Sequence, residues 1–267
     1  MANTTFRVVT FLAPNMLPVY QSLVRYIGDQ LGLQTELVVG TAYDELLDYD
    51  ACFICGLPYI LYTQPRRPSP ALEAIAAPVL QGERYQNRPI YFSDVIVHRD
   101  SPYQTFADLR GCTWAYNEPL SQSGYGITRY TLVKQGETRG YFGKVVQAGF
   151  HQKAIALVSH REIDAAAIDS QVLAIELRDH RNLRDQLRVI DTLGPSTIQP
   201  FAVATHLPIS LKSDIQAVLV HAHTNPTMQA ILARGLIERF AAVQDADYDD
   251  IRQMLSACEQ ADFMVLR

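Results

Sequence analysis

The segment Ser121–Gly126 (SQSGYG) places small polar residues between a strand predicted over 112–116 and a helix predicted over 127–133. A helix start leaves backbone N–H groups without intrahelical acceptors, and these groups and the helix dipole favour an anion. The two serine hydroxyls add donors, and Gly124 permits close approach to the backbone. The segment therefore predicts an anion-binding turn, and the alternative is that Ser123 only caps the helix.

Two further polar residues stand where α/β proteins commonly bind ligands. His151 begins a helix predicted over 151–159, where an imidazole can donate to an anion and shares the positive end of the helix dipole. Asp169 follows a strand predicted over 163–168, and the carboxyl ends of parallel strands face the binding crevice of such sheets. Each has a local alternative, because His151 could be an exposed or capping residue and Asp169 could cap the helix beginning at Ser170.

Aromatic and hydroxyl side chains supply further candidates. Tyr59 lies just past a strand predicted over 51–55, and it would offer a flat ring and a hydroxyl donor. Tyr91 and Ser93 share one face of a predicted strand, and Tyr125 adjoins the two serines. The chain has 14 tyrosines, so packing is the common alternative for any one of them.

Several catalytic and metal-binding patterns are missing from the sequence. It has no G-x-S-x-G elbow, no Walker loop and no G-x-G-x-x-G after the first predicted strand. Cys52 and Cys55 lie in an apolar run typical of a buried strand, so we interpret them as core residues. His221 and His223 are two residues apart on a predicted helix and do not share a face. We therefore predict no catalytic residue, no metal site and no cofactor.

Length and charge limit the class of protein. The chain has 267 residues, 48% of them hydrophobic, which suffices for one large or two small domains. Its formal charge of −5 argues against a nucleic-acid partner, and it contains no apolar run long enough to span a membrane. No apolar leader precedes the first predicted strand, so the protein is expected to be cytoplasmic unless an export signal has been removed.

Strand and helix signals alternate, which predicts an α/β fold with a largely parallel sheet. A proline-rich loop is predicted over 64–70. The middle section, 98–195, is expected to form lobe II, inserted into a lobe I made of 1–97 and 196–267. A cleft between two such lobes would suit a small ligand, with hinge closure around it. Strands are predicted over 6–12, 34–39, 51–55, 76–81, 89–98, 112–116, 144–147, 163–168, 187–192 and 201–205, and helices over 18–31, 43–47, 58–63, 127–133, 151–159, 170–177, 210–221, 227–240 and 248–258.

The order of these motifs resembles the substrate-binding proteins of phosphate, phosphite and phosphonate ABC importers, which have the type II periplasmic-binding fold. The segments that carry the resemblance are Gly56–Tyr59 (GLPY), Tyr91–Val97 with Asp100-Ser101, Phe106–Gly111 (FADLRG), Ser121–Tyr125 (SQSGY), Gly149–His151 (GFH), Ile163–Asp169 (IDAAAID) and Asp247–Arg252 (DYDDIR).

This resemblance implies a role for each candidate residue. Ser121, Ser123 and nearby backbone N–H groups would hold the anion from one lobe, assisted by His151. Tyr59 and Tyr91 would close from the other lobe. The remaining candidates are Asp169, which would accept a hydrogen bond from a protonated oxygen or an amino group of the ligand, and the neighbouring residues Ser93, Gln122, Gly124 and Tyr125.

The chain departs from the family pattern at two places. Gln122 replaces the usual threonine, so an amide stands where a small hydroxyl is expected. The segment Ser196–Pro200 carries no acidic residue where relatives often have one, so a ligand amine would lose a partner.

The resemblance implies transport of a phosphate- or phosphonate-like compound, with a small anionic ligand and an ABC permease as partners. The protein would then be periplasmic or at the cell surface. Two alternatives are a cytoplasmic enzyme on the same fold, similar to enzymes of menaquinone or thiamine synthesis, and a ligand-sensing domain that signals to a protein partner.

Overall fold

The computed structural model describes residues 5–63 and 71–267, and the predicted proline-rich loop over 64–70 lies outside them. The chain divides into two compact units: unit 1 contains Met1–Ile90 and Thr197–Asp249, and unit 2 contains Tyr91–Ser196 and Asp250–Arg267. This division differs from the predicted lobes at two places. The strand over 90–98 belongs to the sheet of unit 2, and the last segment of the chain, from Asp250, also packs with unit 2.

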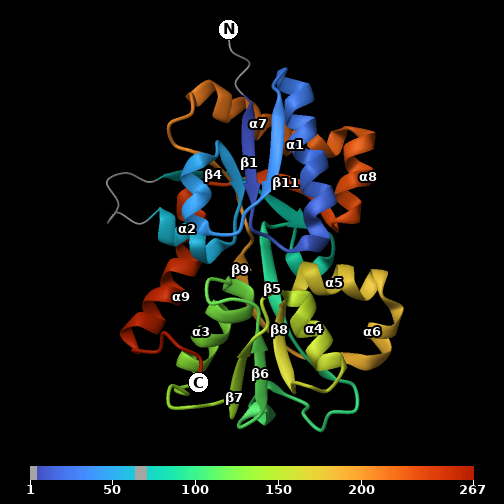
Figure 1. Cartoon of the computed structure of the whole chain (residues 1–267), viewed down its shortest axis with the longest axis vertical. Helices are drawn as coiled ribbons and strands as arrows, with labels where there is room; N and C mark the ends of the chain where they lie inside the picture. Colours follow the sequence, from blue (N-terminus) through green and yellow to red (C-terminus); the bar gives the residue numbers. More distant parts are fainter. Residues whose placement is uncertain (1–4, 64–70) are drawn as a thin grey trace. The chain divides into compact units, whose positions relative to one another are not determined.

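Unit 1, whose helices α1, α7 and α8 are labelled in Figure 1, is built on a sheet with the strand order β11-β4-β10-β3-β1-β2. Helix α1 contacts α7 and α8, and both of those helices also contact β11. Its strands are β1 (Phe6–Thr10), β2 (Thr35–Val39), β3 (Ala51–Phe53), β4 (Leu72–Leu80), β10 (Phe201–Ala204) and β11 (Ile237–Ala242), and its helices include α1 (Leu17–Leu31), α2 (Gly56–Tyr62), α7 (Ile209–His221) and α8 (Pro226–Arg234).

The sheet of unit 1 is mixed, so the prediction of a largely parallel sheet was wrong for this unit. Strand β1 pairs in parallel with β2 and β3, whereas β10 runs antiparallel to both β3 and β4, and β11 runs antiparallel to β4. A helix predicted over 227–240 also proved wrong, because α8 ends at Arg234 and β11 begins at Ile237. Leu236 between them has a φ of 55°, which a helix does not tolerate. Pairing with β4 buries Ile237 and Phe240 and outweighs the local helical pattern.

Unit 2 has a sheet with the strand order β7-β6-β8-β5-β9. Strands β7, β6 and β8 are parallel, while β5 runs antiparallel to β8. The elements of this unit are β5 (Ile90–His98), β6 (Thr113–Tyr116), α3 (Ile127–Lys134), β7 (Lys144–Gln147), α4 (His151–Ser159), β8 (Ala165–Asp169), α5 (Ser170–Asp179), α6 (Arg181–Gln186), β9 (Leu187–Thr197) and α9 (Asp249–Gln260).

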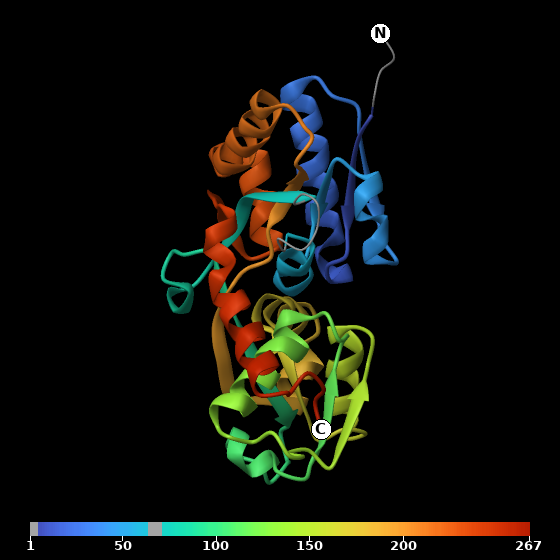
Figure 2. The same ribbon diagram turned by 90° about the vertical axis from the view of Figure 1, so that its left-hand side faces the viewer.

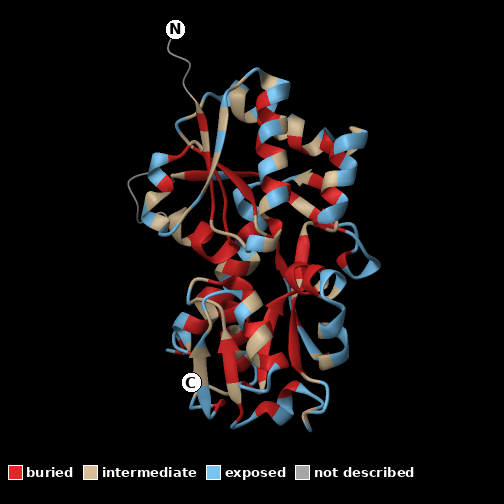
Figure 3. Ribbon diagram, turned by 45° about the vertical axis from the view of Figure 1, so that its right-hand side comes forward, coloured by how far each residue is buried: buried red, intermediate tan, exposed pale blue. Residues whose placement is uncertain are grey.

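Helices cover both faces of the unit 2 sheet. Helices α4 and α5 contact β8 on the side opposite α3 (Figure 1). On the other face, alternate residues of β5 and β8 share one core with Trp114, Leu132 of α3 and Met254 of α9. The last segment of the chain, red in Figure 2, lies beside α3, and its Phe263 and Leu266 complete that core. Strands β6, β8 and β5 in the middle of the unit 2 sheet are largely buried, whereas the edge strands β7 and β9 are mostly partly or fully exposed (Figure 3).

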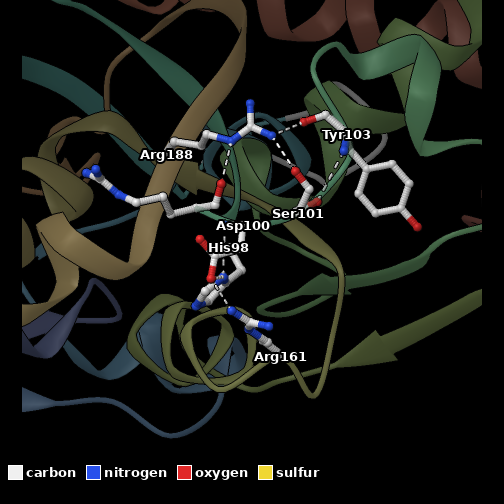
Figure 4. Close-up of polar contacts among 7 residues, drawn as sticks. His98, Asp100, Ser101, Tyr103, Arg161 and Arg188 are labelled. Carbon is white, nitrogen blue, oxygen red and sulfur yellow. Dashed lines mark hydrogen bonds and ion pairs between the residues drawn. The ribbon is translucent and has the colours of Figure 1, made fainter.

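An arginine fixes the loop that follows β5. The Nη2 of Arg188 donates to the backbone oxygens of Ser101 (2.7 Å) and Tyr103 (2.5 Å), as Figure 4 shows. In the same loop, Asp100 forms an ion pair with Arg161. Because a planar guanidinium offers several donors in a fixed fork, one side chain can satisfy several carbonyls of an irregular loop. This loop is therefore held to the sheet by β9, on which Arg188 lies.

Candidate functional site

The polar candidates of unit 2 gather at one edge of its sheet. Strands β7, β6 and β8 are parallel, so their carboxyl ends meet at the same edge. His151 follows β7, the segment from Asn117 to Gly126 follows β6, and Asp169 ends β8. The turn Gln122–Gly126, here called the serine turn together with its cap Ser121, contacts β8. Topology thus brings together residues that are far apart in the sequence.

The serine turn is a single π-helical turn that leads directly into α3. Its cap is Ser121, whose Oγ accepts the N–H of Gly124 at 3.0 Å, so the reading of Ser123 as the cap was wrong. A Cβ on Gly124 would lie 2.1 Å from the Oδ1 of Asn117. The missing side chain of this glycine therefore makes room for the Asn117 amide, and the turn needs glycine here.

Ser123 and His151 form a buried hydrogen-bonded pair. The Oγ of Ser123 lies 3.0 Å from the Nε2 of His151 and 3.5 Å from the Oγ of Ser121. All three side chains are buried, and burial lowers the pKa of His151 to about 4, so the imidazole is neutral near pH 7. Within the described ranges 5–63 and 71–267, its Nδ1 is buried and has no hydrogen-bond partner. The three residues thus form a chain of neutral groups that can donate to or accept from a ligand.

Asp169 caps α5 and also faces a neighbouring strand. Its Oδ1 accepts the N–H groups of Gln171 (2.8 Å) and Val172 (3.2 Å), as the capping alternative predicts. In the antiparallel pairing of β5 with β8, Asp169 stands directly opposite Ser93, and both are buried. Tyr91, two residues earlier on β5, is 1% exposed.

Two members of the serine turn direct their side chains to other parts of unit 2. The Nε2 of Gln122 donates to Ser196 Oγ at 3.2 Å. The hydroxyl of Tyr125 accepts the N–H of Leu266 at 3.2 Å and donates to the backbone oxygen of Met264 at 3.4 Å. These contacts tie the turn to β9 and to the end of the chain.

Tyr59 lies in unit 1, on α2, and is fully buried there. Its hydroxyl donates to Asp245 Oδ1 at 2.9 Å and accepts the N–H of Ala74 at 3.2 Å, while its ring packs 4.8 Å from that of Tyr248. The contacts of this tyrosine therefore hold α2 to β4 and to the segment around Asp245 within unit 1.

Sequence reasoning missed two amides near this edge. The Oδ1 of Asn117 and the Oε1 of Gln152 are buried and, among the residues that the structure covers, accept no hydrogen bond. Asn117 directly follows β6, so its position after a parallel strand was a usable signal. Gln152 lies in the first turn of α4, and its Nε2 donates to Glu176 at 3.1 Å. Unsatisfied buried oxygens favour donors on a bound molecule or water as their partners.

This edge combines neutral donors and acceptors with the buried carboxylates of Asp169 and Glu176. Among the described residues, no group of three or more histidine, cysteine, aspartate or glutamate side chains could hold a metal ion. All four cysteines are buried and reduced, and Cys52 and Cys55 lie in the core of unit 1, as predicted. None of the helices in the described part of the chain is long and apolar enough to span a membrane.

Comparison with known proteins gives a consistent result. A model of the periplasmic substrate-binding proteins of phosphonate ABC transporters matches residues 8–248. A phosphonates-binding periplasmic protein of Escherichia coli (strain K12) is 26% identical over 171 residues, which are 62% of this chain and 50% of that protein. The match thus spans about half the length of this curated relative.

Solved structures share the fold. A binding-protein component of an ABC phosphonate transporter from Pseudomonas aeruginosa superposes with a TM-score of 0.82, at 17% identity, covering 97% of this chain and 88% of that one. A protein of Prochlorococcus marinus in complex with methylphosphonate gives a TM-score of 0.77 at 16% identity, covering 97% and 98%. These similarities confirm the predicted α/β fold of the two-lobed type II periplasmic-binding class.

The family model also separates the functional alternatives raised from the sequence. It covers most of the chain, from residue 8 to residue 248, and describes binding proteins of transporters rather than enzymes. The enzyme alternative is therefore not favoured, and the resemblance inferred from the motifs is confirmed. The chain belongs to the family of periplasmic substrate-binding proteins of phosphonate ABC transporters.

Proposed function

We propose that the chain binds a small phosphonate-like oxyanion at the carboxyl edge of the parallel strands of unit 2. The observation that carries this proposal is the buried chain from Ser121 Oγ through Ser123 Oγ to the Nε2 of His151, with the Nδ1 of that histidine left without a protein partner in the described residues. The ligand oxygens would accept from the serine hydroxyls and from the start of the helix formed by the serine turn and α3.

Neutral donors suit a partly protonated oxyanion. A fixed positive charge would favour the most highly charged anion, whereas hydroxyls and an uncharged imidazole can exchange donor and acceptor roles. Asp169 would accept from a protonated oxygen or an amino group of the ligand. Its Oδ1 also accepts two N–H groups of the helix it caps.

The family supports a role in import. A transporter permease would receive the ligand from this protein, and the periplasm or the cell surface would be its location. The ligand itself is a proposal, supported by the phosphonate named for the curated relative and by the methylphosphonate bound to the Prochlorococcus marinus protein.

A thermal-shift screen followed by calorimetry tests the proposal. The probes are phosphate, phosphite, methylphosphonate, aminoethylphosphonate and sulfate, with a panel of carboxylate metabolites. A ligand at 100 times its dissociation constant adds about 2.7 kcal/mol to the free energy of unfolding, which such a screen detects. We expect a phosphorus oxyanion to give a shift, and a shift with carboxylates alone would contradict the proposal.

The double variant Ser121→Ala, Ser123→Ala locates the ligand. Ser121 is also a cap, so its loss alone lowers stability by about 1 kcal/mol. The matched control is Asn225→Ala, which removes the side-chain cap of α8 in unit 1. We expect both variants to lose similar stability but only the serine variant to lose binding. Unchanged affinity in the serine variant would refute the assigned site.

A further inference from the structure

Gln122 stands between the two serines in sequence but makes its polar contacts elsewhere. Its side chain is 1% exposed, and its Nε2 lies 3.2 Å from both the Oγ of Ser196 and the Sδ of Met254. Ser196 and Met254 are also buried, and the Oγ of Ser196 lies 3.8 Å from the Sδ of Met254. The amide thus closes a small buried cluster made from the serine turn, β9 and α9.

The conformation of this amide is fixed by its own turn. A Cβ on Gly126 would lie 2.4 Å from the Oε1 of Gln122, so the amide fills the space that a side chain at 126 would need. Because the amide folds back over the turn, it has little freedom to leave Ser196 without moving the turn as well. A buried amide that loses its partner also carries a desolvation cost.

The partners of Gln122 lie on two of the segments that connect the units. Ser196 is the last residue of unit 2 on β9, and Met254 lies shortly after the chain returns to unit 2 at Asp250. The remaining connection, at Tyr91, has a related contact, because the N–H of Phe92 donates to Ser170 Oγ at 3.2 Å. Ser170 directly follows the candidate ligand residue Asp169. Each connecting segment therefore touches a residue of the candidate site or its immediate neighbour.

We propose that Gln122 is a positioning residue, which holds the serine turn against β9 and α9 so that an anion bound by Ser121 and Ser123 also stiffens those connecting segments. The inference rests on the proposed anion binding. It gives Gln122 a different role from that implied by the family resemblance, in which this position would contact the ligand directly. In place of the small hydroxyl of the usual threonine, Gln122 then supplies an amide that contacts the connecting segments.

Two substitutions break this tie from opposite sides. Gln122→Met keeps the length and volume of the side chain but removes its donor, and Ser196→Ala removes the acceptor. We expect each to raise the dissociation constant for methylphosphonate, or for the anion that the screen selects, by about five-fold. The double variant should show the same loss as Gln122→Met alone, because that change already removes the contact with Ser196. The control Gln135→Met, at an exposed position after α3, should bind like the wild type.

Hydrogen exchange supplies a readout that a loss of stability would not mimic. In the wild type, the anion should slow exchange in peptides covering 121–126, 192–198 and 250–256. In Gln122→Met, saturating anion should still protect 121–126 but no longer protect the other two peptides, and in Ser196→Ala it should no longer protect 192–198. If one variant fails to fold, the other carries the test alone.

Different outcomes separate this inference from the proposed function. Wild-type protein that binds none of the anions refutes both. Wild-type binding with unchanged affinity and unchanged remote protection in the variants refutes the role of Gln122 alone. Losses that multiply in the double variant would show that the two residues act independently, and they would also overturn the inference.

Discussion

The buried imidazole of His151 predicts a pH-dependent loss of stability that one substitution should remove. Its pKa falls from the ordinary 6.5 to about 4 in the folded protein, because burial disfavours the charged form. Between about pH 6.5 and pH 4, His151 is therefore protonated in the unfolded chain but neutral in the folded protein. Stability from the neutral imidazole is complete above pH 6.5 and is lost as the pH falls through this window toward 4.

The size of the loss follows from the two pKa values. One pKa unit corresponds to about 1.4 kcal/mol, so full protonation of the unfolded state costs about 3 kcal/mol, of which about 2 kcal/mol is lost by pH 5. Urea unfolding of the ligand-free protein at pH 8 and pH 5 measures this difference. His151→Gln keeps a polar group beside Ser123 but cannot titrate, so its free energy of unfolding should fall by about 2 kcal/mol less over the same interval.

A second histidine provides the control. His160 directly follows α4 and its side chain is 66% exposed, so His160→Gln controls for replacing a histidine by glutamine outside the buried site. Comparing variants cancels the titration of all other groups. Equal slopes for wild type and His151→Gln would refute the reasoning, since they would mean that His151 takes up its proton as readily in the folded state as in the unfolded state.

Two further predictions concern other contacts within unit 2, in the loop that follows β5 and at the end of the chain. Arg188→Ala should lower the free energy of unfolding in urea by about 2 kcal/mol, because it leaves several carbonyls of one loop without donors. Arg178→Ala, at an exposed position, should change it by less than about 0.5 kcal/mol. Equal effects would show that Arg188 does not hold the loop. Tyr125→Phe removes the hydroxyl that pairs with Leu266 and Met264, so hydrogen exchange at 264–267 should accelerate while the serine turn still binds anion; unchanged exchange would show that the hydroxyl does not hold the chain end.

Local patterns were enough to find most elements and to place candidate residues at their ends. The helix predicted to begin at His151 is present, and the strand predicted over 163–168 is present as β8, which ends at Asp169. The break between α8 and β11 was not predicted, because it depends on pairing with β4, which is far away in the sequence. The unit assignment of the last segment likewise depends on packing of Phe263 and Leu266 against a core that local sequence does not reveal.

The serine turn also shows that residue type predicts which groups can donate hydrogen bonds better than it predicts where each side chain points. The sequence indicates donors at Ser121, Ser123 and Gln122 alike, but in a π-helical turn consecutive side chains point to different surroundings. The Ser123 hydroxyl lies beside His151 and near that of Ser121, whereas the amide between them reaches Ser196, and Tyr125 reaches the end of the chain. Under the proposed function, this turn would bind the anion with one set of residues and anchor itself with the other. Such anchoring holds the donors in place before the anion arrives, so less ordering is needed when it binds.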